Sequence, residues 1–248
     1  MAGHSKFKNI MHRKGAQDKK RAKIFSRLGR EIAVSVKTSG SDPNSNIRLR
    51  SAISNEKTLN MPKENIDRAI KKGERNDPDS NYEEIRYEGY GPEGVAIIIE
   101  AMTNNKNRTA AEIRSTFSKF GGSLGESRSV SYSFKRLGEI SLDKKLAQED
   151  EIFEFALENK SKNLEVNENV YLIYCDQNDL HILNEKIIKK FGETKSSQLV
   201  WKNENNIDGQ KDNAEKLFKL LNTLEDNEDV QSVSSNFEVS DEILQTLT

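Results

Sequence analysis

The residues with the most evident chemistry in this 248-residue chain are the lysines and arginines near its beginning. Residues 1–40 contain eleven Lys and Arg but only Asp18 and Glu31 as acids, a formal charge of +9. The whole chain carries −1, so these cations are concentrated in one stretch. Such a stretch needs a partner with dense negative charge, and nucleic acid is the commonest one.

The charge divides the chain into two parts of opposite sign. Residues 1–75 hold nineteen Lys and Arg against seven Asp and Glu, or +12, and residues 76–248 hold twenty against thirty-three, or −13. This asymmetry predicts a basic binding module joined to an acidic body. The acidic body is a candidate surface for a protein partner, with ordinary solvated carboxylates as the alternative.

The predicted nucleic-acid contacts are mostly cations of the N-terminal arm and of the helices that follow it. They are Lys6, Phe7, Lys8, His12, Arg13, Lys14, Lys19, Lys20, Lys23, Arg27, Arg30, Arg48, Arg50, Lys71 and Lys72. Cations that neutralise phosphates release counterions, so affinity should fall steeply with salt. No segment presents Asn, Gln and Arg together for reading base edges, so these contacts position a backbone. Phe7 either stacks on an exposed base or anchors the arm.

No catalytic or metal-binding constellation stands out. Cys175 lies in an apolar strand, where a core role outweighs a reactive one, and His181 begins a helix without a nucleophile beside it. Residues 89–94 are glycine-rich but lack the Lys-Ser/Thr of a phosphate loop, so a turn is expected. His4 and His12 lack nearby Cys or acidic partners for zinc. We therefore expect no enzymatic activity, no metal, no cofactor and no small-molecule substrate.

The cysteine count and the apolar runs of the sequence indicate the cellular compartment of the protein. One cysteine allows no intramolecular disulfide and fits a reducing cytosol. No apolar run approaches the roughly 18 residues that cross a bilayer, and the charged beginning lacks the apolar core of a secretory signal. The expectation is a cytoplasmic protein without a membrane partner.

Helices are predicted for most of the first 78 residues. The apolar residues Phe25, Leu28, Ile32 and Val36 fall on one arc of a helix over 16–37. Five cations fall on the opposite arc and are expected to face solvent: Lys19, Lys20, Lys23, Arg27 and Arg30.

Two further helices complete a predicted three-helix bundle. The second should begin at Asp42-Pro43, with Asp42 as its N-cap and Ile47, Leu49, Ala52 and Ile53 on its buried face. The third should restart at Met61-Pro62 and end at Gly73 as a C-terminal cap.

Residues 74–81 are predicted to be a linker, and β-strands are predicted in the residues that follow it. Strands are predicted at 95–101 and 129–134, with a helix at 108–120. Residues 139–202 then follow the order βαββαβ of a ferredoxin-like domain. The order consists of strands 139–142, 164–166, 170–175 and 197–201, a helix over 147–157 with Ile152, Phe153, Ala156 and Leu157 inward, and a helix over 180–191.

A last helix at 214–224 and strand at 230–237 have no strand partners nearby in sequence. The economical solution pairs them with the incomplete unit at 95–134. The predicted fold class is α+β, with an N-terminal three-helix bundle and two α/β sandwich domains. The predicted domains are 1–78, a discontinuous middle domain of 79–137 with 205–248, and an inserted ferredoxin-like domain over 138–204. Domains in simple succession are the alternative.

Several motifs resemble the YebC/PmpR family over essentially the whole chain, most densely in residues 1–135. They are Ala2-Gly3-His4-Ser5-Lys6, His12-Arg13-Lys14, Gln17-Asp18-Lys19-Lys20-Arg21, Asn60-Met61-Pro62-Lys63-Glu64-Asn65-Ile66, the stretch from Tyr82 to Pro92, and Asn107-Arg108-Thr109. Phe7 stands where many members have Trp, which keeps an aromatic side chain.

The resemblance implies a cytoplasmic three-domain protein, usually described as a DNA-binding transcriptional regulator. Related members include a mitochondrial activator of translation, and some bacterial relatives look like ribosome-associated factors. The sequence leaves two nucleic-acid functions open: transcriptional regulation on DNA, and translation control on ribosomal or messenger RNA. Both ligands are polyanions that cations meet in the same way.

Overall fold

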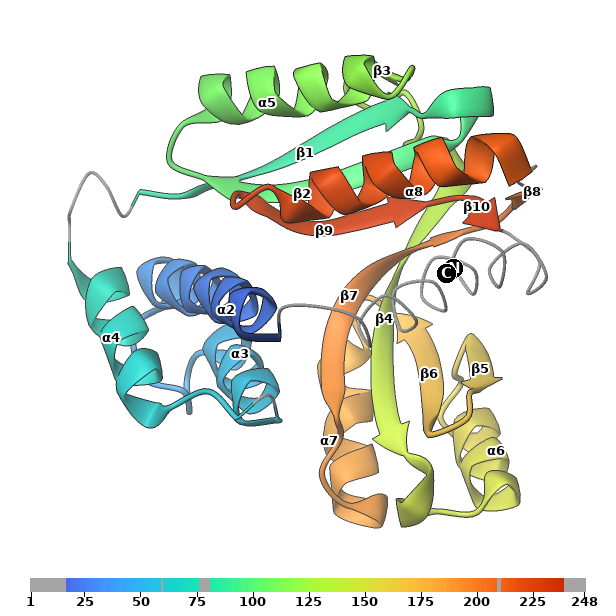
Figure 1. Ribbon diagram of the computed structural model, residues 1–248. Coiled ribbons are helices and arrows are strands. Elements are labelled where there is room, and N and C mark those ends of the chain that lie inside the picture. The colour runs from blue at the N-terminus through green and yellow to red at the C-terminus, as the bar shows by residue number, and fades with distance from the viewer. Residues whose placement is uncertain (1–16, 59, 76–80, 209–210, 239–248) are drawn as a thin grey trace. The chain divides into compact units, whose positions relative to one another are not determined.

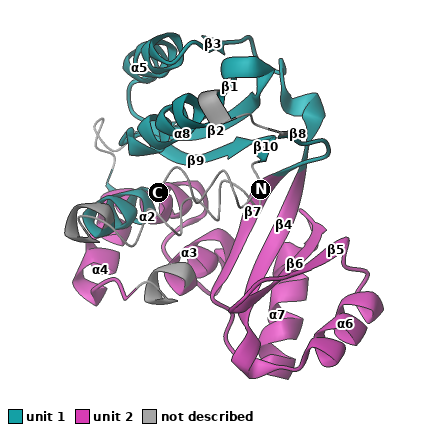
Figure 2. Ribbon diagram, turned by 45° about the vertical axis from the view of Figure 1, so that its right-hand side comes forward, with its two compact units in different colours: residues 1–30, 75–135, 202–248 teal, residues 31–74, 136–201 magenta. Residues whose placement is uncertain are grey.

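In the computed structural model, residues 17–58, 60–75, 81–208 and 211–238 are described, and they form helices and two four-stranded sheets (Figure 1). They divide into two units (Figure 2). Unit 1 contains residues 1–30, 75–135 and 202–248, and unit 2 contains residues 31–74 and 136–201. The predicted α+β class, with a helical N-terminal region followed by two sheets, is confirmed.

The sheet of unit 1 has the strand order β3-β1-β2-β9. These strands are β1 (Glu83–Tyr90), β2 (Ala96–Thr103), β3 (Ser123–Leu124) and β9 (Val230–Ser235). β2 corresponds to the predicted strand at 95–101. β1 was not predicted, because its sequence is mostly polar and has no apolar run. Of the residues 89–94 for which a turn was expected, Gly89 and Tyr90 are the end of β1, and residues 91–94 form the turn to β2, where Gly91 N donates to Val95 O at 2.8 Å.

Two helices cover one face of this sheet. α5 (Lys106–Lys119) and α8 (Lys211–Asp226) lie along the strands (Figure 1). The alternate β2 residues Ile97 and Ile99 are fully buried against Phe117 of α5 and Leu221 of α8. Burying a large apolar side chain contributes about 1.5–3 kcal/mol, so this layer is the main source of stability in unit 1. A short parallel pair, β8 (Ile207–Asp208) with β10 (Phe237–Glu238), adjoins it.

β9 pairs with β2 although about 130 residues separate them. The antiparallel register sets Ile97 opposite Ser235 and Ile99 opposite Val233. Residues 136–201, which lie between these strands in sequence, belong to unit 2. This pairing is the one that a discontinuous middle domain requires. The three-domain division itself stays a prediction.

The sheet of unit 2 has the order β5-β6-β4-β7. Its elements follow in the chain as β4 (Phe134–Asp143), α6 (Glu149–Glu158), β5 (Asn163–Val166), β6 (Val170–Asp176), α7 (Leu180–Phe191) and β7 (Ser196–Asn203). The first and third strands of βαββαβ are therefore central, as in ferredoxin-like folds. The core contains Ile140, Ile152, Ile173 and Ile187, all fully buried.

Two details of the second half differ from the predictions. Phe153 and Leu157 of α6 are 55% and 66% exposed, and Phe155 points inward instead with Ile152 and Ala156. The predicted strand at 129–134 is also wrong, because residues 131–133 form a 3-10 turn before β4. The Glu88 carboxylate accepts hydrogen bonds from Val130 N at 2.8 Å and Ser131 N at 2.9 Å, which holds this turn.

The helices before β1 are α2 (Gln17–Ser39), α3 (Ile47–Thr58) and α4 (Lys63–Glu74). α3 begins at Ile47, four residues after Pro43, because the buried Asn46 caps it: Asn46 Oδ1 accepts from Leu49 N at 3.0 Å. Asp42 instead accepts from Asn44 N in the preceding turn, so its predicted role as the N-cap is wrong. Ile47 is half exposed and not part of the buried face.

Gly73 lies inside α4 and does not cap its end, as the sequence suggested. A Cβ at this position would be 2.5 Å from Ala33 O and 2.7 Å from Val36 Cβ of α2. Ala33 and Val36 are themselves buried. Only glycine therefore allows the close approach of α4 to the second half of α2.

Replacing Gly73 by alanine tests this contact. Alanine would gain about 1 kcal/mol of helix propensity, but the extra methyl group should overpack the contact and cost about 1–3 kcal/mol. We expect Gly73→Ala to lower the free energy of unfolding in urea, whereas Lys71→Ala on the exposed side of α4 should leave it nearly unchanged. A more stable Gly73→Ala protein would show that the helices do not pack closely here.

Candidate nucleic-acid interface

The structure describes part of the predicted set of nucleic-acid contacts. Lys6, Phe7, Lys8, His12, Arg13 and Lys14 lie outside the described residues. Lys19 and Lys20 fall in the first turn of α2, and their side chains are outside the described part. The roles of these eight residues stay predictions.

Three cations of α2 contact the chain segment 225–229 instead of facing solvent. Lys23 Nζ donates to Asp226 Oδ1 at 3.0 Å and to the Asp226 carbonyl. Arg27 Nη2 donates to the Glu225 carbonyl, and Arg30 Nη1 donates to the Glu228 carbonyl at 2.5 Å. The expectation that these three cations face solvent is wrong, because their N–H groups donate to carbonyl and carboxylate oxygens of residues 225–229.

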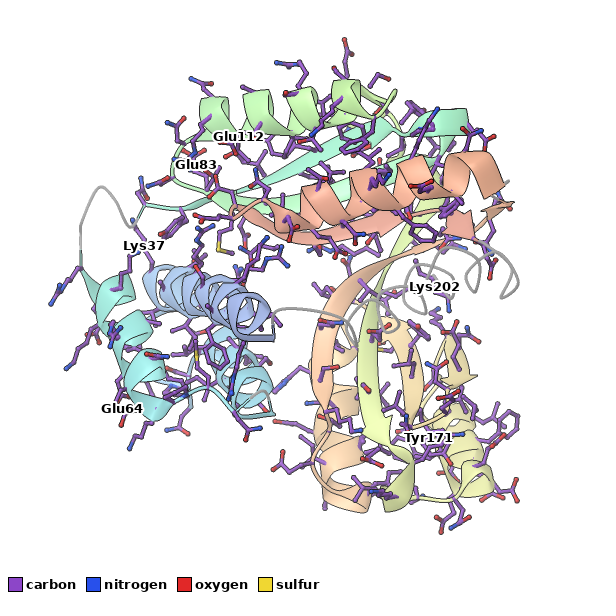
Figure 3. All side chains as sticks on the ribbon, in the orientation of Figure 1. Lys37, Glu64, Glu83, Glu112, Tyr171 and Lys202 are labelled. Carbon is purple, nitrogen blue, oxygen red and sulfur yellow. The ribbon has the colours of Figure 1, made fainter. Side chains whose placement is uncertain are left out.

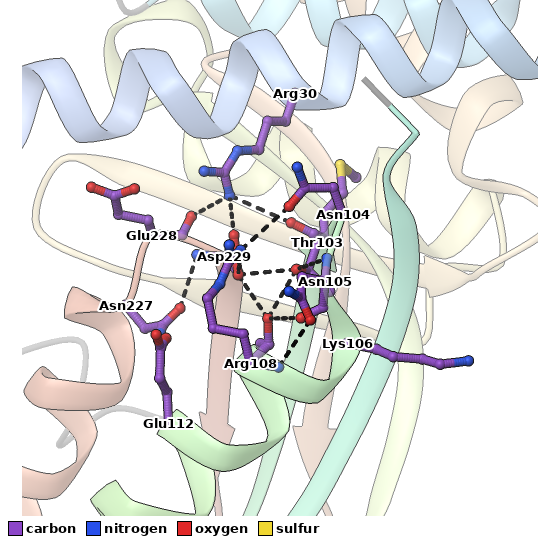
Figure 4. A network of polar contacts seen from close by, with 12 residues as sticks. Arg30, Thr103, Asn104, Asn105, Lys106, Arg108, Glu112, Asn227, Glu228 and Asp229 are labelled. Atoms are coloured by element: carbon purple, nitrogen blue, oxygen red, sulfur yellow. Dashed lines mark hydrogen bonds and ion pairs between the residues drawn. The ribbon is translucent and has the colours of Figure 1, made fainter. Parts of the chain in front are cut away.

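Asp229 is the centre of a buried polar network at the start of β9 (Figure 4). Its side chain is 7% exposed. Asp229 Oδ1 accepts from Arg30 Nη1 at 3.0 Å. Asp229 Oδ2 accepts from Arg108 Nη2 at 2.7 Å, from Thr109 Oγ1 at 2.7 Å and from Thr103 Oγ1 at 3.0 Å. One carboxylate thus joins α2, the end of β2 and the beginning of α5.

Local structure brings these donors together. β2 ends at Thr103, and Asn105 caps α5 by accepting from Arg108 N at 3.1 Å, which places Thr109 one turn inside the helix. Met102 N donates to the Asp229 carbonyl at 2.8 Å and fixes the carboxylate beside them. This network was not predicted from the sequence. The Asn107-Arg108-Thr109 motif of the family resemblance was the only signal that pointed to it.

The environment keeps Asp229 ionised. Burial alone would raise the pKa of this carboxyl group, but the hydrogen bonds from Arg108, Thr109 and Thr103 outweigh burial and hold the pKa below its ordinary value. The hydrogen bond between Arg108 and Asp229 in turn raises the pKa of the Arg108 guanidinium group. The network is therefore anionic at its centre and cationic at its edges, which is the arrangement that charged hydrogen bonds favour.

Arg48 and Arg50 of α3 also have partners within unit 2. Arg48 makes a bidentate ion pair with Glu31, with Nε–Oε1 and Nη2–Oε2 distances of 2.6 and 3.1 Å. Arg50 Nη2 lies 3.1 Å from His181 Nε2 and 4.0 Å from Glu185 Oε1. A phosphate would have to share these guanidinium groups with their present partners.

α4 presents cations directly to solvent. Lys71 and Lys72 are exposed, as is Arg68 one turn earlier. Their i, i+3, i+4 spacing places all three on one face, opposite the buried Ile66 and Gly73. Figure 3 shows the side chains of α4 extending from its ribbon, with Glu64 marking the first turn. Arg68 was not among the predicted contacts. Its helical spacing from Lys71 was the sequence signal that could have identified it.

Other groups with possible chemistry have structural surroundings. Cys175 is 2% exposed, and burial, with Asp179 and Asp176 nearby, raises the pKa of its thiol to about 11. Such a thiol is not a nucleophile at neutral pH. Among the residues that the structure describes, no three His, Cys, Asp or Glu side chains are grouped to hold a metal ion. None of the described helices combines the length and apolar character needed to cross a membrane.

Removing the charge of Asp229 should destabilise the protein. We expect Asp229→Asn to lower the free energy of unfolding in urea at neutral pH by about 1.5–3 kcal/mol, since hydrogen bonds to a charged group are lost. Glu215→Gln, which breaks the exposed pair of Glu215 with Lys219 at 2.6 Å on α8, is the matched control and should have a much smaller effect.

The Asp229 contribution should also depend on pH. Its pKa in the folded protein lies below the ordinary value of 3.8, so its stabilisation is complete above that pH and is lost as the pH falls through the lowered pKa. The stability gap between the wild type and Asp229→Asn should therefore narrow in urea titrations repeated down to about pH 3. A difference in stability that stays the same as the pH falls would show that the charge of the Asp229 carboxylate does not stabilise the network.

Comparison with known proteins agrees with this architecture. Residues 5–76 match the model of the TACO1/YebC protein N-terminal domain, and residues 82–237 match the TACO1/YebC second and third domain. A crystal structure of a conserved hypothetical protein, Aq1575 from Aquifex aeolicus, is similar at 43% sequence identity and a TM-score of 0.84. The similarity covers 92% of this chain and 94% of that one. The chain belongs to the TACO1/YebC family, which supports a role in regulating transcription or translation.

Proposed function

We propose that the protein is a non-enzymatic, cytoplasmic nucleic-acid-binding regulator that acts on DNA as a transcriptional regulator. The observation that carries the proposal is the charge of +12 on residues 1–75, which nearly coincide with the matched N-terminal domain at 5–76. The exposed cationic face of Arg68, Lys71 and Lys72 on α4 supports it. The N-terminal arm, with Lys6, Lys8, Arg13 and Lys14, would extend the same charge.

The binding chemistry of this proposal is contact with phosphates. Lysine and arginine ends on a helix surface neutralise backbone charge and set the position of the nucleic acid, but they do not read bases. Transcriptional regulation additionally requires discrimination between sites, typically at least about a thousandfold. A binding profile over promoter fragments tests this requirement, and equal affinity for all fragments would contradict operator recognition.

The second candidate is a ribosome-associated translation factor that binds RNA through the same cations. Two observations favour it: the family comprises TACO1 as well as YebC, and the arm contains the aromatic Phe7, a side chain suited to stacking on unpaired bases. Crosslinking in cells followed by sequencing of the bound nucleic acid separates the candidates. Recovery of ribosomal or messenger RNA would favour translation, and recovery of promoter DNA would favour transcription.

Both candidate functions use the cationic face of α4, and its role can be tested by reversing its charge. We expect Lys71→Glu with Lys72→Glu to weaken binding to a short labelled duplex DNA or RNA hairpin. The slope of log affinity against log salt should fall by about 1 for each phosphate that the variant no longer neutralises. The titrations should run from about 50 to about 200 mM salt, where such interactions weaken most visibly.

The matched control reverses two exposed lysines of the sheet region of unit 2, Lys162→Glu with Lys189→Glu. It makes the same change in net charge and should leave the affinity and salt slope nearly unchanged. Equal weakening by both double variants would indicate a general charge effect. Unchanged binding by the α4 variant would remove α4 from the interface.

A further inference from the structure

The segment 225–229 presents oxygen atoms to the cations of α2 as a nucleic-acid backbone would. It contains the last two residues of α8, Glu225 and Asp226, followed by Asn227, Glu228 and Asp229. The final carbonyls of a helix lack intrahelical donors and carry the negative end of its dipole. Four carboxylates in five residues add to this charge. The segment can therefore bind ammonium and guanidinium groups of other residues in the same chain.

Its partners on α2 are three residues of the predicted nucleic-acid set. Lys23, Arg27 and Arg30 follow each other at i, i+4 and i+7, which places them on one face of the helix. Each donates to a carbonyl of the segment, and Lys23 and Arg30 also pair with a carboxylate, both at 3.0 Å. A cation bound in this way has fewer donors left for a phosphate, and the oxygens of the segment repel the negative charge of the phosphate.

The contacts differ in strength along the helix. The Arg30–Asp229 pair is mostly buried, with side chains 14% and 7% exposed, and it is supported by Arg108 and two threonines. The Lys23–Asp226 pair is open to water, since the Asp226 side chain is 81% exposed. Exposed pairs contribute little, whereas removal of one partner from a buried pair is costly. Arg30 is thus an anchor, and Lys23 can exchange its partner.

Arg27 is incompletely bonded in its present position. Its Nη2 donates to the Glu225 carbonyl, but its buried Nε has no hydrogen-bond partner among the described residues. Guanidinium groups bind phosphates through two parallel N–H donors. A phosphate could therefore satisfy a donor that the segment 225–229 leaves without a partner.

We propose that the segment 225–229 competes with nucleic acid for Lys23 and Arg27, so that these two cations bind phosphates only after release from the end of α8. This inference rests on the proposed nucleic-acid function and adds its regulation. Arg30 keeps its bond to Asp229 throughout and is not a phosphate contact. The acidic residues of the segment 225–229 in unit 1 then determine how tightly α2 binds nucleic acid.

The test measures binding of the full chain to a short fluorescein-labelled duplex DNA by anisotropy. Glu225→Gln with Asp226→Asn removes two charges of the competing segment and should tighten binding about threefold to tenfold, as expected when weak exposed pairs are removed. The control, Glu204→Gln with Glu215→Gln, removes two exposed acids of unit 1 that pair with Lys135 and Lys219. It should change affinity less than about twofold, within the effect of distant charge.

A second pair of variants identifies the cations that are released. In a background of Lys23→Gln with Arg27→Gln, the tightening caused by Glu225→Gln with Asp226→Asn should disappear, because the gain requires both sides of the contact. Thermal unfolding of every variant shows whether it is folded. Persistence of the gain in this background would overturn the proposal.

The outcomes separate this inference from the function on which it rests. Tighter binding by the Glu225/Asp226 variant alone supports competition, even where the wild type binds weakly. Equal affinity of that variant, the control and the wild type, with binding still weakened by reversal at Lys71 and Lys72, overturns competition and leaves the proposed function standing. No binding by any protein, including the Glu225/Asp226 variant, overturns both.

Discussion

The polar contacts that join α2, β2, α5 and β9 in unit 1 depend on one buried carboxylate, that of Asp229. A buried aspartate is tolerated only when its charge is compensated and its oxygens accept hydrogen bonds. Arg30, Arg108, Thr103 and Thr109 meet both requirements. The reverse also holds, since Thr103 and Thr109 are buried and would lack this charged acceptor without Asp229. The start of β9, the cap of α5 and the middle of α2 are consequently fixed by the same interaction.

This interaction changes the meaning of the basic N-terminal region. Its net charge is a sum over the sequence, and the acids that pair with α2 reduce the field that a polyanion would meet there. Direct phosphate contact depends on individual side chains, and these fall into two groups. Lys23, Arg27 and Arg30 are held by the segment 225–229, whereas Arg68 and Lys71 of α4 are exposed to solvent. In the proposed nucleic-acid function, attraction of the polyanion and direct phosphate contact would therefore involve partly different residues.

Much of the fold could be predicted from periodicity, and the errors have identifiable causes. α7 has the predicted bounds at 180–191, because its apolar spacing and its glycine end are unambiguous. α6 was found, but its inward face was displaced: Phe153 and Leu157 are as apolar as Phe155, so composition alone could not choose among them. β1 was missed because its partner β2, and not its own sequence, makes it a strand.

The sequence by itself determined the segregation of charge, the family, the α+β class and most helix positions, because these depend on composition and on neighbours within a few turns. Only the tertiary structure decided which cations are exposed. Arg30 and Asp229 are 199 residues apart, and Lys23 and Asp226 are 203 apart. Their pairing follows from β9 joining β2 and from α8 ending beside α2. No local pattern contains that information, since the partner of each cation is set by the path of the whole chain.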